Sequence, residues 1–248
     1  MIRVIPARER HFSDFEWLRT YWLFSFAEYY DPSNIQFGPL RVFNDDVVAP
    51  GAGFPTHPHR EMEIITIPLS GEITHADSMG NRAIIVPGDV QRMSAGTGLT
   101  HSEYNLGESP VHFYQIWIYP DQRGLPPGYD QRRFDSSEWH NRLWPVASGR
   151  GLPDVVTLCA DATILRAELD SGVSFLHDPG EDRRLFLYLT YGAITLNESE
   201  LAAQDQARVD GVPRIHVTAR SASGLVLVDL PSGRGVGYDA ATLRGARA

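Results

Sequence analysis

The sequence has 248 residues, 42% of them hydrophobic and 21% charged, which allows a buried core and excludes a disordered polymer. Its 22 basic residues are all arginine, against 31 acidic residues, so the net charge is −9. Without lysine, Schiff-base chemistry and a phosphate-binding P-loop are excluded, and an acidic chain lacks the basic face that nucleic-acid binding needs. Cys159 is the only cysteine, which excludes an internal disulfide and a cysteine-rich metal site.

The N-terminal residues contain no apolar segment typical of a signal peptide. No apolar run in the sequence reaches the roughly 18 residues that a membrane-spanning helix needs. We therefore expect a cytoplasmic protein without membrane or direct nucleic-acid partners, present as a monomer or a weak dimer.

The predicted strands are short, rich in β-branched and aromatic residues, and separated by turns that contain Gly, Pro, Asn and Asp. In chain order they cover 21–27, 40–43, 64–69, 83–86, 113–119, 155–159, 164–169, 185–189, 193–196, 214–217 and 225–230. The segments 136–144 and 198–203 are predicted to form short helices. Short strands at this spacing indicate an all-β sandwich or barrel.

Apolar strands stop over a stretch of polar residues and glycine in the middle of the chain. We therefore predict two β domains, residues 1–133 and 150–248, joined by a linker at 134–149. The two halves have a similar strand rhythm without obvious sequence identity.

Three of the nine histidines lie in a pattern that indicates a metal site. His57 and His59 are two residues apart, so a strand would direct both rings to the same face. His101 and Glu103 have the same spacing, and a second strand would present them from across the barrel. Three imidazoles and a carboxylate suit divalent iron, zinc, nickel, copper or manganese. The histidines expected to be exposed or locally hydrogen-bonded are His11, His75, His112 and His140.

The residues around these histidines resemble the two sequence motifs of cupins. Gly51 lies six residues before His57, and Glu63 lies four residues after His59, as in the first motif. Residues 96–105 resemble the second motif, with glycine at 96 where cupins have proline.

Longer runs of the sequence resemble the pirin family of bicupins, over roughly residues 9–133. These runs are 40–46, 53–66, 77–81, 87–98, 101–105 and 115–118. Residues 150–248 resemble, more weakly, the degenerate second cupin of bacterial members. The resemblance implies an all-β bicupin of two stacked small β-barrels, with a metal only in the first barrel.

Carried over by position, the resemblance implies that the metal ligands are His57, His59, His101 and Glu103. Many cupins use the glutamate of the first motif instead, which is Glu63 here, and both glutamates are present. We assign Glu103 as a ligand and as the general base of catalysis. Glu63 is expected to lie outside the ligand shell and to orient a histidine ring.

The metal-linked activity of the family is quercetin 2,3-dioxygenase. The resemblance therefore implies a metal-dependent dioxygenase that opens the heterocycle of flavonols such as quercetin and releases carbon monoxide. We expect one divalent metal per chain, with Fe(II) favoured and Zn, Ni, Cu, Mn or Co as alternatives. The substrates would be a flavonol-like aromatic molecule and dioxygen, in a pocket lined mainly by apolar and aromatic residues.

Two other functions fit the same ligands. Some members of the family act as regulators, so the chain could be a non-catalytic metal-binding regulator or redox sensor that acts through a protein partner. A non-oxygenase cupin, such as an isomerase, would also use these ligands. Flavonol turnover with release of carbon monoxide would distinguish the dioxygenase from both alternatives.

Overall fold

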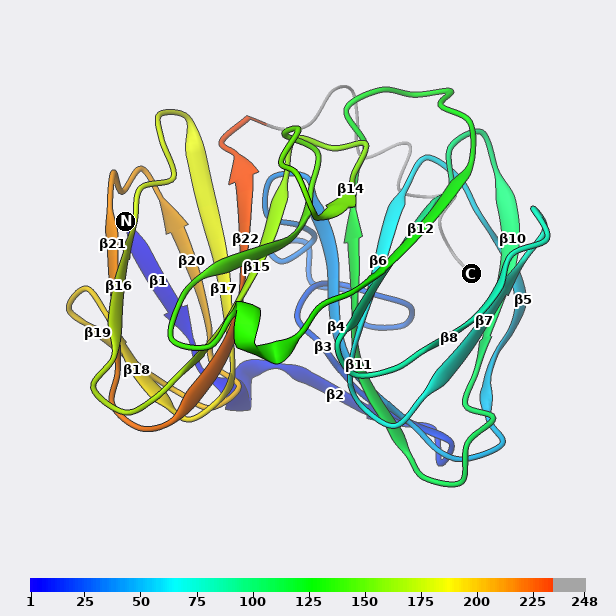
Figure 1. The fold of residues 1–248 in the computed structure, drawn as a ribbon, viewed down its shortest axis with the longest axis horizontal. Helices are drawn as coiled ribbons and strands as arrows, with labels where there is room; N and C mark the ends of the chain where they lie inside the picture. Colours follow the sequence, from blue (N-terminus) through cyan, green and yellow to red (C-terminus); the bar gives the residue numbers. More distant parts are fainter. Residues whose placement is uncertain (234–248) are drawn as a thin grey trace. The chain divides into compact units, whose positions relative to one another are not determined.

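The structure is a computed structural model in which residues 1–233 are described (Figure 1). These residues form 22 β-strands and two short 3-10 helices, so the prediction of an all-β fold is confirmed. Contacts divide them into two compact units. The first unit comprises residues 11–134 and 156–160, and the second comprises residues 1–10, 135–155 and 161–233. Over this part of the chain, no helix is long and apolar enough to cross a lipid bilayer.

The first unit consists of a larger and a smaller antiparallel sheet. The larger sheet contains, in spatial order, β12 (Gly128–Arg133), β9 (Asp89–Ser94), β6 (Glu63–Ser70), β11 (Val111–Ile118), β4 (Leu40–Val48), β3 (Leu18–Trp22) and β2 (His11–Asp14). The smaller sheet contains β5 (Gly53–His59), β10 (Leu99–Tyr104), β7 (Ile73–Asp77) and β8 (Arg82–Ile85). Figure 1 shows β5, β10, β7 and β8 side by side.

Strand β6 illustrates how the sequence specifies a central strand. Ile64 and Ile65 are neighbours and therefore point to opposite faces, and both are buried. Thr66 lies opposite Gln91 of β9 on one side and opposite Gln115 of β11 on the other. A strand that is buried on both faces has a nearly continuous apolar sequence, which is the pattern that predicts it.

The second unit also consists of two antiparallel sheets. The larger contains, in spatial order, β1 (Ile2–Ile5), β20 (Gln206–Asp210), β17 (Arg183–Tyr191), β22 (Ser223–Pro231), β15 (Thr163–Leu169) and β13 (Trp144–Ser148). The smaller contains β16 (Ser174–His177), β21 (Ile215–Ala219), β18 (Ala193–Leu196) and β19 (Ser199–Ala202). Buried aliphatic side chains from both sheets form one core cluster, including Leu187, Leu196, Val217 and Leu227.

Both predicted helices are wrong over most of their length. Residues 199–202 of the predicted helix at 198–203 form strand β19, which pairs with β18 through a turn at Asn197 and Glu198. Asn197 has a φ of 50°, a conformation that hairpin turns require and that asparagine tolerates. The predicted helix at 136–144 is limited to η2 (Ser136–Glu138). The remaining short elements are η1 (Ala7–Glu9) and β14 (Val156–Thr157).

The division into units differs from the predicted domain boundaries. Strand β1 pairs with β20, with Ile2 opposite Val209, so residues 1–10 belong to the second unit. The predicted linker at 134–149 contains β13, which pairs with β15. These pairings join segments far apart in the chain, and local sequence patterns carry no signal for them. The predicted second domain runs to residue 248, and its residues 234–248 lie outside the described residues.

Candidate metal centre

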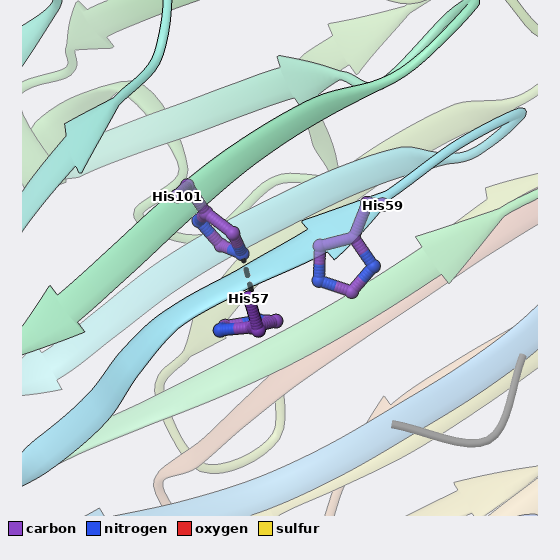
Figure 2. Close-up of side chains that lie close together, drawn as sticks. All are labelled: His57, His59 and His101. Carbon is purple, nitrogen blue, oxygen red and sulfur yellow. Dashed lines mark hydrogen bonds between the residues drawn. The ribbon is translucent and has the colours of Figure 1, made fainter.

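Three histidine side chains come together on the smaller sheet of the first unit (Figure 2). His57 and His59 lie on β5, and His101 lies on β10 directly opposite His57. The Nε2 atoms of His57 and His101 are 3.0 Å apart. The ring centroid of His59 lies 4.8 Å from that of His57 and 5.0 Å from that of His101.

The two strands that carry the histidines are hydrogen-bonded neighbours, so the expectation that His101 approaches from across the barrel is wrong. The alternation of side chains along β5 places His57 and His59 on one face, as predicted. Which strand lies beside β5 is decided by long-range pairing, which residue spacing alone does not determine.

Strands β5 and β10 approach each other closely beside the histidines. A Cβ atom on Gly53 would lie 2.2 Å from the carbonyl oxygen of Glu103, so only glycine fits there. Between His101 and Glu103 the register of the pair shifts, because β5 contains an extra residue. Bulges of this kind re-aim side chains next to functional sites.

Burial keeps two of the three rings neutral. It lowers the pKa of His59 to about 3, with a further contribution from the charge of His57. Burial also lowers the pKa of His101 to about 2, and the neighbouring histidines add to this shift. A neutral imidazole keeps a lone pair for a metal, so these rings fit a divalent cation at neutral pH.

Glu103 lies two residues beyond His101 on β10 and is only 2% exposed. Its Oε2 accepts a hydrogen bond from Nε2 of Gln115 at 2.9 Å, and its Oε1 accepts one from Oγ1 of Thr66 at 3.3 Å. Burial raises the pKa of Glu103 to about 7, although both hydrogen bonds oppose the shift. One carboxylate oxygen of Glu103 and one ring nitrogen each of His75 and His101 all lie within 4.8 Å of one another.

Glu63 has a different environment from the one expected. Its Oε2 accepts a hydrogen bond from the backbone N–H of Cys159 at 2.9 Å and lies 3.9 Å from Nε of Arg92. Thr66, three positions further along β6, faces Glu103, so Glu63 points to the opposite face of the sheet. The expectation that Glu63 orients a ligand histidine is therefore wrong, because its carboxylate contacts the segment 156–160 instead.

His75 is a member of the cluster that the sequence analysis missed. It is fully buried on β7, where it lies opposite Glu103 of β10, and burial lowers its pKa against the opposing effect of Asp77. The expectation of a local hydrogen bond holds, because His75 Nε2 lies 3.3 Å from Oδ2 of Asp77. A signal was present, since His75 and Asp77 are two residues apart in an apolar strand, as His57 and His59 are.

The face of the larger sheet that is turned toward Glu103 is more polar than expected. Asn44, Gln115, Thr66 and Gln91 lie opposite one another on four neighbouring strands and form a polar row. Oδ1 of Asn44 and both amide atoms of Gln91 are buried without a hydrogen-bond partner. This row replaces part of the apolar lining that we predicted.

An aromatic wall adjoins the other side of the histidine cluster. The ring of Trp117 lies edge-on to His59 with the centroids 4.9 Å apart, and Phe26 packs edge-on to Trp117 at 5.3 Å. Trp22 continues the wall at 5.5 Å from Phe26. Flat side chains and polar groups therefore both lie close to the histidines.

Each of the two units is built from a larger and a smaller antiparallel sheet, and the first unit contains the histidine cluster. Together these features define a bicupin. A family model described as "Pirin" matches residues 5–118, and a second, described as "Quercetinase C-terminal cupin domain", matches residues 145–230. The chain belongs to the pirin family, which confirms the resemblance seen in the sequence.

Curated relatives and solved structures match nearly the whole chain. A "Pirin-like protein" of Caulobacter vibrioides is 41% identical over 218 residues, which cover 88% of this chain and 94% of the relative. A "Quercetin 2,3-dioxygenase" of Escherichia coli K12 is 39% identical over 232 residues, which cover 93% and 99%. The bacterial pirin YhhW of Escherichia coli, in its crystal structure in complex with nickel(II), is 38% identical in sequence and superimposes with a TM-score of 0.88. The match covers 93% of this chain and 99% of the YhhW chain. The histidine and glutamate cluster and this nickel complex together support a divalent metal.

Proposed function

We propose that His57, His59, His101 and Glu103 bind one divalent metal and that the chain is a dioxygenase that opens the heterocycle of flavonols. The observation that carries this proposal is the convergence of three imidazoles beside a buried carboxylate. When bound, the metal would act as a Lewis acid and keep positions open for small molecules. Fe(II) is our first candidate, and nickel, found in the complex of the relative, is the second.

The protein groups around the cluster have distinct parts in this proposal. The imidazoles of His59 and His101 offer neutral nitrogen donors. Each oxygen of Glu103 accepts one hydrogen bond, from Thr66 or from Gln115, and keeps further lone-pair capacity. That capacity suits Glu103 to hold the cation and to accept the proton of a substrate hydroxyl.

The surroundings of the cluster suit a flat, hydroxylated aromatic substrate. Trp117 and Phe26 offer ring surfaces for stacking. Asn44 and Gln91 have buried polar atoms without partners, which can form hydrogen bonds with hydroxyl groups. The name of the Escherichia coli relative, quercetin 2,3-dioxygenase, supports the same class of substrate.

The test is reconstitution of tag-free, metal-free protein with Fe(II) or Ni(II) under anaerobic conditions, followed by quercetin and oxygen. We expect one equivalent of metal per chain, loss of the flavonol absorbance and one carbon monoxide per quercetin consumed. His57→Ala with His101→Ala should abolish both metal binding and turnover. Full metal binding without turnover above that of free metal would contradict the dioxygenase and favour a metal-binding regulator.

A further inference from the structure

His75 lies directly behind His101, on the side away from His57. Strand β7 pairs with β10, with Asp77 opposite His101 and His75 opposite Glu103. The Nδ1 atoms of His75 and His101 are 3.5 Å apart, while Nε2 of His101 faces His57. The two nitrogens of His101 therefore face different partners.

Asp77 anchors this arrangement because a tight turn holds its carboxylate. Its Oδ1 accepts hydrogen bonds from the backbone N–H groups of Met79 at 2.9 Å and Asn81 at 3.1 Å. Its Oδ2 accepts one from Nδ2 of Asn81 at 2.9 Å and lies 3.3 Å from Nε2 of His75. Four donors thus surround one carboxylate, which acts only as an acceptor while it is ionised.

One arrangement of protons satisfies the contacts of Asp77, His75 and His101 and also leaves a lone pair for a metal on Nε2 of His101. Because Asp77 accepts, the neutral ring of His75 carries its proton on Nε2 and has a lone pair on Nδ1. That lone pair can accept a hydrogen bond only if His101 carries its own proton on Nδ1. His101 is then left with the lone pair of Nε2, which points toward His57. His57 matches this arrangement, because its Nδ1 lies 2.7 Å from the carbonyl oxygen of Pro55 and carries the ring proton, so that the Nε2 lone pairs of His57 and His101 face each other as two ligands of one cation would.

We propose that Asp77 and His75 form a hydrogen-bonded relay that fixes the tautomer and orientation of His101, so that its Nε2 is ready to bind the metal. The inference rests on the metal site proposed above and makes His75 and Asp77 positioning residues. Metal-bound histidines commonly donate their second N–H to a partner of this kind. Here the partner is another histidine, and the turn after β7 sets its orientation.

A competing role for His75 is direct metal binding, because His75, His101 and Glu103 could themselves hold an ion. That role would require Nδ1 of His101 to turn its lone pair toward His75. The contact of His75 with Asp77 would then support a ligand rather than a relay. The two roles predict different donor sets and different tautomers, so they can be separated by experiment.

The first measurement reads the tautomers in metal-free protein, by long-range ¹H–¹⁵N NMR of the histidine rings. We expect His101 in the Nδ1–H form and His75 in the Nε2–H form. Asp77→Asn should convert part of His101 to the other tautomer, because the new amide can donate to His75. Wild-type protein with His101 in the Nε2–H form, or no change in the variant, would overturn the proposal.

The second measurement is the Kd for Co(II), from chelator competition, with the visible spectrum of the bound ion. We expect Asp77→Asn to weaken binding about 10- to 100-fold while the spectrum keeps its donor set. Asp45→Asn is the matched control, because Asp45 contacts His112 in a similar pair away from the cluster. It should leave the affinity unchanged, and an equal loss in both variants would overturn the relay.

A variant of His75 keeps the test decisive if Asp77→Asn does not fold. His75→Gln retains an acceptor for His101 and should bind Co(II) more tightly than His75→Phe, which has none. Loss of one imidazole donor from the spectrum of His75→Gln would show that His75 is a ligand and overturn the relay. If the double variant with His57→Ala and His101→Ala binds as much metal as the wild type, the proposed metal site itself is wrong. The tautomer measurement needs neither bound metal nor turnover, so it tests the relay separately.

Discussion

His59, His101 and Glu103 are ionisable groups whose pKa values burial moves in opposite directions. The histidine pKa values fall and that of Glu103 rises, because burial disfavours the charged form of each group. A bound divalent cation would lower the pKa of Glu103 again, since its positive charge favours the carboxylate anion. Without a cation, the rings of His59 and His101 are neutral at pH 7 and the carboxyl group of Glu103 is about half protonated.

The two glutamates of the cupin motifs provide a direct test at the residue scale. Glu103→Gln replaces an anionic donor by a neutral amide of similar size, whereas Glu63→Gln makes the same change on the opposite face of β6. We expect Glu103→Gln to raise the metal Kd about 100-fold or more, because even supporting residues are worth about 10- to 100-fold. Glu63→Gln should leave Kd unchanged. Chelator competition with Ni(II) measures both, and equal effects would contradict the assignment.

Asp46 gives a prediction for pH. Burial raises its pKa to about 8, and the neighbouring carboxylates Asp45 and Glu103 add to the shift, while Thr20 opposes it. Because the folded-state pKa lies above the unfolded value, Asp46 favours folding most at low pH. This contribution is lost as the pH rises from about 4 to about 8, at up to about 1.4 kcal/mol per pH unit.

Asp46→Asn should remove this dependence, because asparagine stays neutral. In metal-free protein, the free energy of unfolding of the variant relative to wild type should increase with pH between 5 and 8. Urea unfolding at several pH values measures it. A flat difference would contradict the raised pKa of Asp46.

At the scale of strands, the site depends on the close approach of β5 and β10. Gly53 allows the approach because a Cβ atom would collide with the backbone of β10. Gly51, just before β5, is different, because it has a φ of 74° and a Cβ atom there would meet nothing within 4 Å. The glycine at 53 is needed for space and the glycine at 51 for backbone conformation.

Alanine at the two glycines should therefore act differently. Gly51→Ala should cost about 1–2 kcal/mol of unfolding free energy, because its conformation disfavours a side chain. Gly53→Ala should cost about 3 kcal/mol or more and weaken metal binding, because relief of the overlap must separate the two strands. Urea unfolding and chelator competition measure the two effects. Similar metal affinity in both variants would show that the pairing at Gly53 does not shape the site.

Much of the site could be predicted because its signals are local. The period of two along a strand places His57 with His59 and His101 with Glu103. The resemblance to pirins, rather than the general cupin spacing, selects Glu103 over Glu63 as the predicted ligand. Other features depend on which strands become neighbours. The contact of His75 with His101 requires the pairing of β7 with β10, and the orientation of Glu63 requires knowing the face on which Thr66 lies.

About as much of the fold as of the site could be predicted from the sequence. Strands with apolar, β-branched runs, such as 64–69 and 185–189, lie within β6 and β17. The prediction of a helix at 198–203 was wrong because it followed the composition of this segment. In the structure the segment is a strand in which Leu201 is buried between two exposed neighbours. A positive φ at Asn197 is needed for the turn that makes this segment a hairpin arm.

At the scale of the whole molecule, the two units are interleaved along the chain. The second unit takes its edge strand β1 from the N-terminus, and residues 156–160 belong to the first unit. Val4 of β1 lies opposite Ala207 of β20 and packs against the core of the second unit. A substitution near the N-terminus should therefore act on the second unit.

Val4→Ser and Arg3→Ser form a matched pair on β1. Val4 contacts the core cluster of the second unit, whereas Arg3 is exposed. Val4→Ser should cost about 1–2 kcal/mol and speed hydrogen exchange in β20, while Arg3→Ser should change little. Exchange in β6 and the metal Kd should be unaltered in both. Faster exchange in β6 with β20 unaffected would contradict the assignment of β1 to the second unit.

The pairing of β1 with β20 also has a consequence for the order of events during synthesis. The N-terminal amine of Met1 contacts the carbonyl of Asp210, 209 positions later. The described part of the first unit is complete once residue 160 has left the ribosome, and domains tend to fold as they emerge. Throughout that time β1 has no partner, and its backbone groups are available to other chains. A stalled or truncated chain that ends before β20 would thus carry a finished first unit and an unpaired strand that is prone to aggregation.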